Sequence, residues 1–324
     1  MSVSQTNRLQ QILLIALVVQ IALAVWVFWP KPAASQTSGP LLGDFSTDSV
    51  TSLTISDSDN TLTLTKQNDG WVLSDAGDFP VTEEQVTTLL DNIEKVQTNR
   101  MVTQTDTSHR RLQVAPDDFN RRLELTLSDG TTHDLYVGSS AGAGATHVRA
   151  DDQTEVYLTG DIDAFNINPQ PSGWIDTLYF TIPQTATTQL TLENSNGTFE
   201  FVKDGENWTL SDLAEDETFN QNAFTSMLNQ MISVRMSEPI GTEAQADFGL
   251  DTPQATVTLD TTDETYTLIF GAKNPEDSDD YVFKASNSPY YVRISSFTGD
   301  NLINKTRADF LEAPPEEEGA SELE

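Results

Sequence analysis

The 324-residue sequence contains no cysteine. A chain without thiols forms no disulfide, no thiolate nucleophile, no lipid-modified N-terminal cysteine and no cysteine-based metal site. Basic residues are also scarce: 17 Lys and Arg stand against 50 Asp and Glu, which gives a formal net charge of −33. Such a surface repels nucleic-acid phosphates and anionic lipid headgroups, so the composition argues against nucleic-acid binding. It is typical of a protein that works in high salt, where like charges are screened.

No complete catalytic set accompanies this acidic composition. The segment 138–142 reads Gly-Ser-Ser-Ala-Gly and formally matches the Gly-x-Ser-x-Gly nucleophile elbow, with Ser140 in third place. A true elbow needs an acid and then a histidine downstream, whereas only His147 follows, on a predicted strand that it shares with an outward-facing Arg149. We therefore predict a flexible hairpin loop at 138–142 and no catalytic residue.

Ligand-binding candidates are equally few. His109, His133 and His147 lack the spacings of zinc sites, and we interpret them as ordinary surface histidines. The acidic clusters 57–60 and 276–280 offer hard oxygen ligands for Ca²⁺, although neither has EF-hand spacing, and we favour solvated charge for both. We predict no cofactor and no metal site. Calcium binding in an acidic loop stays open, as does hydrolysis by paired carboxylates, since their separation is a tertiary distance.

The longest apolar run lies near the N-terminus. Residues 12–29 are interrupted only by Gln20, so we predict a cytoplasmic tail at 1–8, a transmembrane helix at 9–29 and a linker at 30–44. The competing interpretation is a cleaved signal peptide, but this apolar core exceeds the usual length of about 7 to 15 residues. We expect a single-pass protein in the bilayer of the cytoplasmic (inner) membrane, with its C-terminal domains in the periplasm or outside the cell.

The remainder of the chain contains a duplication. The run from Trp71 to Asp75, Trp-Val-Leu-Ser-Asp, returns as Trp-Thr-Leu-Ser-Asp from Trp208 to Asp212. A whole unit follows in the same order each time, so we predict repeats at 45–180 and 181–311, with a disordered acidic tail at 312–324. The residues that mark equivalent positions are Trp71 and Trp208, Leu73 and Leu210, and Gly138 and Gly271.

Each predicted repeat combines antiparallel hairpins with one packed helix. Alternating apolar residues predict strands such as 50–56 and 61–66, and the turn 68–70 joins the second of these to Trp71. The first helix is expected to begin at Thr82, with Gln85 completing a capping box, and the second to begin at Asn220. The expected fold class is α+β: an N-terminal transmembrane helix, then two tandem repeats of mainly antiparallel sheet with one packed helix each.

Three stretches carry a family resemblance: 66–73, 203–210, and the run Phe-Gly-Leu-Asp-x-Pro at 248–253. Through them the chain resembles the domain-of-unknown-function 4340 family over residues 45 to 310. The first repeat departs from the pattern, because Leu-Gln-Val-Ala-Pro at 112–116 stands where the second has Phe-Gly-Leu. The resemblance implies a membrane anchor with repeated extracytoplasmic domains. Since members are typically encoded beside ABC transporters of the gliding-motility kind, it also implies a transporter-associated role.

Three functional hypotheses follow. The leading one is a non-enzymatic accessory or docking component of an envelope ABC-transporter complex, with transporter subunits as partners. The alternative is an extracytoplasmic polymer- or solute-binding module that uses a cleft between the repeats. An envelope hydrolase comes third. The binding module requires a contiguous pocket lined by aromatic residues such as Trp174, Tyr179, Tyr290 and Tyr291.

Overall fold

The computed structural model describes residues 13, 16–20, 38–68, 70–274 and 278–313. Residues 13 and 16–20 are helical. Most of the predicted span 9–29 and of the linker, the whole tail 1–8, and residues 314–324 lie outside the described residues. In the described part of the chain, no helix is long and apolar enough to cross a membrane.

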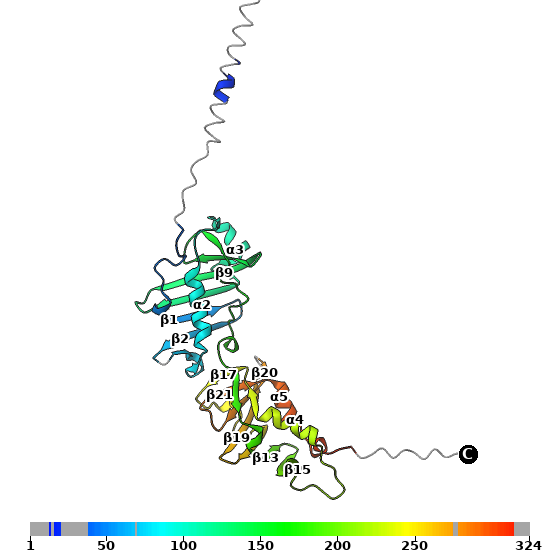
Figure 1. Ribbon diagram of the computed structural model, residues 1–324. Coiled ribbons are helices and arrows are strands. Elements are labelled where there is room, and N and C mark those ends of the chain that lie inside the picture. The colour runs from blue at the N-terminus through cyan, green and yellow to red at the C-terminus, as the bar shows by residue number, and fades with distance from the viewer. Residues whose placement is uncertain (1–12, 14–15, 21–37, 69, 275–277, 314–324) are drawn as a thin grey trace, which may run out of the picture.

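The first unit is built on a nine-stranded sheet in which every neighbouring pair is antiparallel. The helix α2 (Glu83–Lys95) crosses one face of this sheet (Figure 1) and buries Val86, Leu90 and Ile93. In spatial order the strands are β4 (Phe79–Pro80), β3 (Gly70–Leu73), β2 (Thr61–Gln67), β1 (Val50–Ser56), β8 (Arg121–Leu127), β9 (Thr132–Gly142), β10 (Ala145–Ala150), β11 (Val156–Thr159) and β5 (Met101–Thr103).

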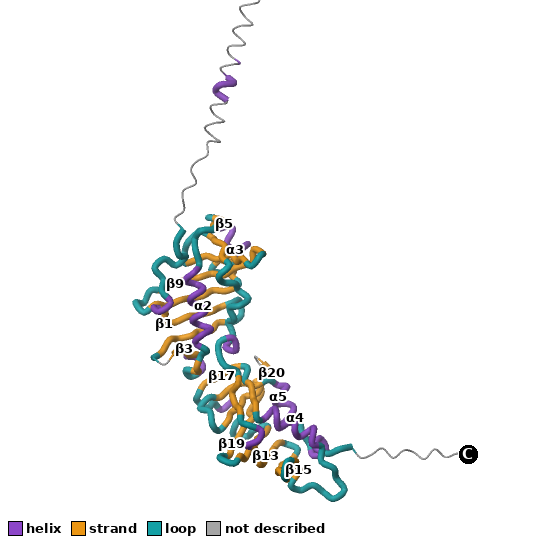
Figure 2. Tube along the Cα trace, viewed as in Figure 1, coloured by secondary structure: helices purple, strands orange, loops and turns teal. Residues whose placement is uncertain are grey.

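The second unit repeats this order with eight antiparallel strands. Strands far outweigh helices in both units (Figure 2), which confirms the prediction of mainly antiparallel sheet. In spatial order they are β15 (Asn207–Leu210), β14 (Gly197–Asp204), β13 (Thr187–Asn194), β18 (Ala255–Thr261), β19 (Thr265–Asn274), β20 (Ser278–Ala285), β21 (Tyr291–Ile294) and β17 (Glu238–Gly241).

Shorter elements complete the two units. Two small sheets pair β6 (Val114–Ala115) with β7 (Asp118–Phe119) and β12 (Leu178–Thr181) with β16 (Ser233–Arg235). The short helix α3 (His109–Leu112) accompanies α2 in the first unit. The 3-10 turns are η1 (Thr47–Ser49), η2 (Ser74–Ala76), η3 (Asp106–Ser108), η4 (Pro171–Gly173), η5 (Gln184–Ala186), η6 (Ala246–Phe248) and η7 (Arg307–Phe310).

The prediction of one helix per repeat is wrong. The second unit carries both α4 (Gln221–Met231) and α5 (Ser296–Ile303), and the first carries the additional turn of α3. The α5 sequence contains glycine, threonine and several polar residues, so its helix propensity is low. Tertiary burial of Leu302 and Ile303 and an N-cap at Ser295, whose side chain accepts from the Thr298 amide, hold it helical.

The two tryptophans that reveal the duplication occupy matching places. Trp71 on β3 faces Lys66 on β2 across the ladder, and Trp208 on β15 faces Lys203 on β14. Both indoles are buried, with 4% and 7% of their surface exposed. Trp208 packs against Phe224 of α4 with ring centroids 4.8 Å apart. In the first unit β3 likewise contacts α2. Burial of a large aromatic side chain accounts for the recurrence of tryptophan at this position.

Gly138 and Gly271 show how residues 112–116 of the first repeat align with residues 248–250 of the second. A Cβ on Gly138 would lie 2.2 Å from the Leu112 carbonyl oxygen, and one on Gly271 would lie 2.1 Å from that of Phe248. Only glycine permits these approaches, so Leu112 and Phe248 hold the same place in the two repeats. The next residue is left-handed in both copies, with φ of 57° at Gln113 and 65° at Gly249.

The helix starts were placed correctly, although one cap differs from the prediction. Asn220 accepts from the Ala223 amide at 3.0 Å, as an N-cap does. Thr82 stands at the N-cap of α2, but its side chain makes no cap hydrogen bond, and the amide of Gln85 instead donates to the Thr82 carbonyl at 3.1 Å. The predicted capping box is therefore not formed.

Ordered packing begins before the predicted start of the first repeat at residue 45. Leu41 and Leu42 are buried, and the Leu41 amide donates to the Val96 carbonyl at 2.8 Å. Proline and glycine around this short apolar pair are turn-forming residues, which made the segment resemble linker. At the second repeat, the β12 segment 178–181 pairs with β16, so it packs as part of the second unit.

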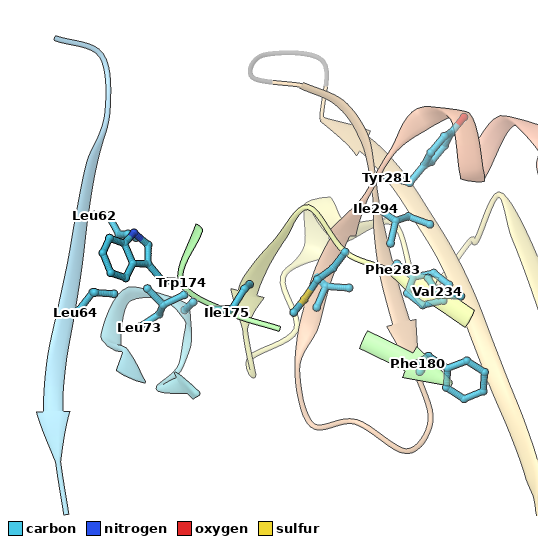
Figure 3. Packing of buried hydrophobic residues seen from close by; sticks show 14 of the residues in the cluster. Leu62, Leu64, Leu73, Trp174, Ile175, Phe180, Val234, Tyr281, Phe283 and Ile294 are labelled. Atoms are coloured by element: carbon cyan, nitrogen blue, oxygen red, sulfur yellow. The ribbon is translucent and has the colours of Figure 1, made fainter. Parts of the chain in front are cut away.

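The two units lie end to end (Figure 1) and share a continuous apolar cluster. Phe79 meets the Tyr290 ring edge-on with centroids 4.7 Å apart, and the Tyr290 hydroxyl donates to the Asp78 carbonyl at 3.2 Å. Trp174 and Ile175, from the connection, lie between the first sheet and the second core (Figure 3). On one side are Leu62, Leu64 and Leu73, and on the other Phe283 and Ile294.

Candidate functional site

The serine motif lies in a strand and not in the predicted flexible loop. β9 continues through Gly142, and Ser140 pairs with Thr146 of β10. The Ser140 hydroxyl accepts from the Gly142 amide at 3.2 Å. His147 instead contacts Ser139, with Nδ1 at 2.7 Å from its carbonyl oxygen and 3.3 Å from its hydroxyl. The structure thus does not bring Ser140 and His147 together as a nucleophile and its base.

The expectation of an outward-facing Arg149 and of surface histidines is also wrong. Arg149 exposes 3% of its surface, and His109 and His147 expose 8% and 9%. The guanidinium lies over the Tyr136 ring at 4.2 Å, and Nε donates to the Val114 carbonyl at 2.7 Å. The segment from α3 to β7 covers this end of the sheet, since β6 contacts both β9 and β10. His133 is only partly buried and lies 3.1 Å from an Asp151 carboxylate oxygen.

The acidic clusters are occupied by hydrogen bonds of the protein itself. Asp57 Oδ1 accepts from the amides of Asp59 and Asn60 at 2.9 and 2.8 Å. Burial would raise the pKa of Asp57, but these hydrogen bonds outweigh it and hold the pKa below its usual value. In the other cluster, Asp280 accepts from the Ser237 hydroxyl at 2.5 Å, and residues 276 and 277 lie outside the described residues. Within the described ranges, no three His, Asp or Glu side chains gather as metal ligands.

The four aromatic candidates do not share one pocket. Tyr179 donates to the Tyr290 carbonyl at 2.7 Å and packs on Phe283, and burial raises the pKa of its hydroxyl. Tyr290 contacts the first unit, as described above, while Tyr291 packs against Phe248 with centroids 5.4 Å apart. The tyrosines therefore serve the second core and the junction between the units.

Trp174 lines a hollow of about 380 Å³ between the start of α2 and the connection 161–174. Its indole nitrogen donates to the Asn168 carbonyl at 2.6 Å, and its own carbonyl accepts from the Thr82 amide at 2.7 Å. These bonds fix the connection against the helix N-terminus. Leu89, Ile162 and Ile167 supply further apolar lining, and the carboxylates are those of Glu84, Asp161 and Asp163.

All the charged side chains that line this hollow are acidic. No Lys, Arg or His belongs to its described lining. An apolar surface with carboxylates around it suits a group that is both cationic and partly apolar, such as a lysine or arginine side chain. The volume falls at the lower end of the range for small-molecule pockets, about 300 to 1,000 Å³.

Comparison with protein families identifies the scaffold that carries this hollow. The profile described as Domain of unknown function (DUF4340) matches residues 71–240 and again 216–315. The chain belongs to the DUF4340 family. This confirms the resemblance drawn from the two tryptophan stretches, and the two matches agree with a tandem arrangement. Comparison with curated proteins and with solved structures gives no match.

Of the residues that line the hollow in this DUF4340 chain, Trp174 was a pocket candidate from the sequence, and the carboxylates were not. Glu84 lies in the first turn of α2, and Asp161 and Asp163 lie in the connection that follows β11. The signal that was available is local: Asp163 stands two residues before Phe165 and three before Asn166, and it accepts from both amides at 3.0 Å. That spacing indicates an aspartate-capped turn, but not what the turn presents.

Proposed function

We propose that this DUF4340 protein is a non-enzymatic accessory or docking component of an envelope ABC-transporter complex. The observation that carries the proposal is the joining of its duplicated units. A shared apolar cluster and the Phe79–Tyr290 contact fix the spacing between two sheets of the same topology. A fixed spacing lets one chain engage two places on an assembly, and the second contact then forms at a high effective concentration.

A membrane location completes the proposal. Residues 9–29 would anchor the chain in the cytoplasmic membrane and leave both units in the periplasm or outside the cell. In support, residues 12–29 are apolar except for Gln20, which is the composition of a membrane-spanning helix. Protease added to spheroplasts should remove residues 44 to 310 and leave a short membrane-bound fragment. Protection of both units would overturn this location.

The absence of catalysis belongs to the same proposal. Ser140 is held in a strand ladder, and the histidine near it bonds to Ser139. We expect Ser140→Ala, Ser139→Ala and His147→Ala each to rescue the phenotype of a deletion strain in full. Loss of rescue by a stable, membrane-inserted Ser140→Ala or Ser139→Ala protein would favour an envelope hydrolase instead.

Reciprocal capture tests the docking role directly. Full-length protein with a C-terminal tag should recover the membrane and ATP-binding subunits of an ABC transporter from gently solubilised membranes, and a tagged transporter subunit should recover the full-length protein. A tagged single-pass membrane protein of unrelated sequence is the control for detergent-dependent association. Recovery of the same subunits by that control, or failure in both directions, would contradict the proposal.

A further inference from the structure

Among the described residues, one aromatic side chain stands almost fully in solvent. Phe165 exposes 91% of its surface, in the connection that follows β11. Exposure of a single apolar residue is common, so exposure alone decides little. Here the surrounding backbone is held in place: Asp163 accepts from the Phe165 amide at 3.0 Å, and Arg121 Nε donates to the Ile167 carbonyl at 2.7 Å. The chain thus presents Phe165 on a preorganised turn.

The same turn borders two hollows. Asp163 lines both the hollow of about 380 Å³ beside α2 and a second, of about 370 Å³, that Phe165 itself helps to form with Ser140 and Thr146 of the first sheet. Aromatic residues, phenylalanine included, are enriched in protein interfaces, and a protruding one beside concave surface suits an anchor. Preorganisation of the turn lowers the entropic cost of binding, because little remains to be ordered.

Charge indicates what approaches this surface. Glu84, Asp161 and Asp163 supply carboxylates, and no Lys, Arg or His belongs to the described lining of either hollow. Arg121, which holds the turn, is engaged by the Ile167 carbonyl and lies 3.6 Å from Asp57. The complementary surface is therefore basic and apolar together.

We propose that Phe165 and the hollow beside α2 form a docking surface for a protein segment that carries a lysine or arginine next to an apolar residue. The basic side chain enters the hollow past Glu84, with its alkyl stem on Leu89 and Trp174, and Phe165 inserts into the partner. The inference rests on the proposed docking function and names the surface and the chemistry of the partner.

Photocrosslinking in the native host tests this proposal with the full chain. A photoreactive benzoyl-phenylalanine is placed at Phe165 and, as a matched control, at Phe297, which is 72% exposed on α5 of the second unit. We expect a discrete protein adduct from position 165, at least about fivefold stronger than from 297, because anchors concentrate contact while other exposed residues do not. The crosslinked partner segment should contain a lysine or arginine and an apolar residue. An adduct to lipid, an adduct to a segment with no basic residue, or equal yields at both positions would overturn the proposal.

Two glutamates at the start of α2 provide the charge control. Glu84 lines the hollow and Glu83, its exposed neighbour, does not. Glu84→Lys should lower the crosslink yield at position 165 at least about fivefold through like-charge repulsion, whereas Glu83→Lys, with the same change in net charge and helix-end charge, should change it less than about twofold. If the two variants lowered the crosslink yield equally, charge would act only through the net charge of the surface. That result would overturn the hollow beside α2 as the binding site.

Capture of transporter subunits separates this inference from the proposed function. Phe165→Ala should weaken recovery about 30-fold if Phe165 is an anchor residue, and Phe297→Ala should leave it unchanged. Full recovery by Phe165→Ala would overturn the docking surface and leave the docking role standing. Failure of the wild-type chain to recover any subunit would overturn the docking role itself.

Discussion

The Gln221 side chain hydrogen-bonds to both backbone polar groups of Trp208. Its Nε2 donates to the Trp208 carbonyl, and its Oε1 accepts from the Trp208 amide at 3.3 Å. In the first unit β4 fills the corresponding place, and the Val81 amide donates to the Trp71 carbonyl at 2.9 Å. The second sheet has no counterpart of β4 in its strand order and ends at β15. Gln221 therefore protects an edge strand that the first unit covers with backbone.

Removal of the Gln221 side-chain amide should destabilise the edge strand β15. We expect Gln221→Ala to lower the free energy of unfolding by about 1–3 kcal/mol, since it leaves two partly buried backbone groups without partners. The Trp208 amide should exchange faster with deuterium. Asn222→Ala, at the next position and exposed, is the control. Unchanged exchange at Trp208 would show that Gln221 does not hold this edge.

The two tryptophans should contribute equally to stability. Trp71→Ala and Trp208→Ala are each expected to lower the free energy of unfolding by about 3–5 kcal/mol, as large-to-small changes in a core do. Urea denaturation of the full-length protein measures both, with the exposed Phe297→Ala as reference. A cost below about 1 kcal/mol for either tryptophan would contradict their equivalence in the two repeats.

The left-handed position shared by the repeats should favour glycine in both. Gln113→Gly is expected to stabilise the protein by about 1 kcal/mol, because it relieves a left-handed conformation in a residue with a Cβ. Gly249→Ala should destabilise it, since the new Cβ would meet the Ala272 Cβ at 2.9 Å as well as requiring φ of 65°. Thermal denaturation compares the two, and destabilisation by Gln113→Gly would refute the equivalence of 113 and 249.

The C-terminal turn η7 should respond to acid. Glu217 lies 2.7 Å from the Arg307 guanidinium, and this hydrogen bond, with one from the Ala214 amide, lowers the Glu217 pKa from 4.5 to about 2. A carboxylate whose pKa is lowered on folding stabilises the fold above its unfolded pKa, and that stabilisation is lost as pH falls through the folded pKa.

The corresponding measurement is the stability difference between wild type and Glu217→Gln. It should be constant above pH 4.5 and shrink as pH falls toward about 2, while amides 307–310 of the wild type lose protection relative to their intrinsic exchange rates at each pH. Glu215→Gln, an exposed neighbour, removes a carboxylate of the same type and is the control. A difference between wild type and Glu217→Gln that grows on acidification would contradict the ion pair.

Local patterns predicted the sheets well, because alternation and turn residues report directly on strands and hairpins. The register of Trp71 and Trp208 followed from a repeated run that both copies use for the same packing. The burial of Arg149 did not follow, because the segment that covers it, from α3 to β7, lies far from it in sequence. The carboxylates of the hollow beside α2 did not follow either, since they come from a helix start and a distant connection.

The requirement for both repeats is the central claim, and quantitative capture of transporter subunits tests it most directly. The full-length chain is compared with a chain that ends before Thr187 and with one that lacks residues 1 to 35, after circular dichroism shows that each is folded. We expect each shortened chain to recover at least about tenfold less partner, because spaced contacts and the anchor act together. Undiminished recovery by a folded single repeat would contradict the account and make each repeat an independent binding module.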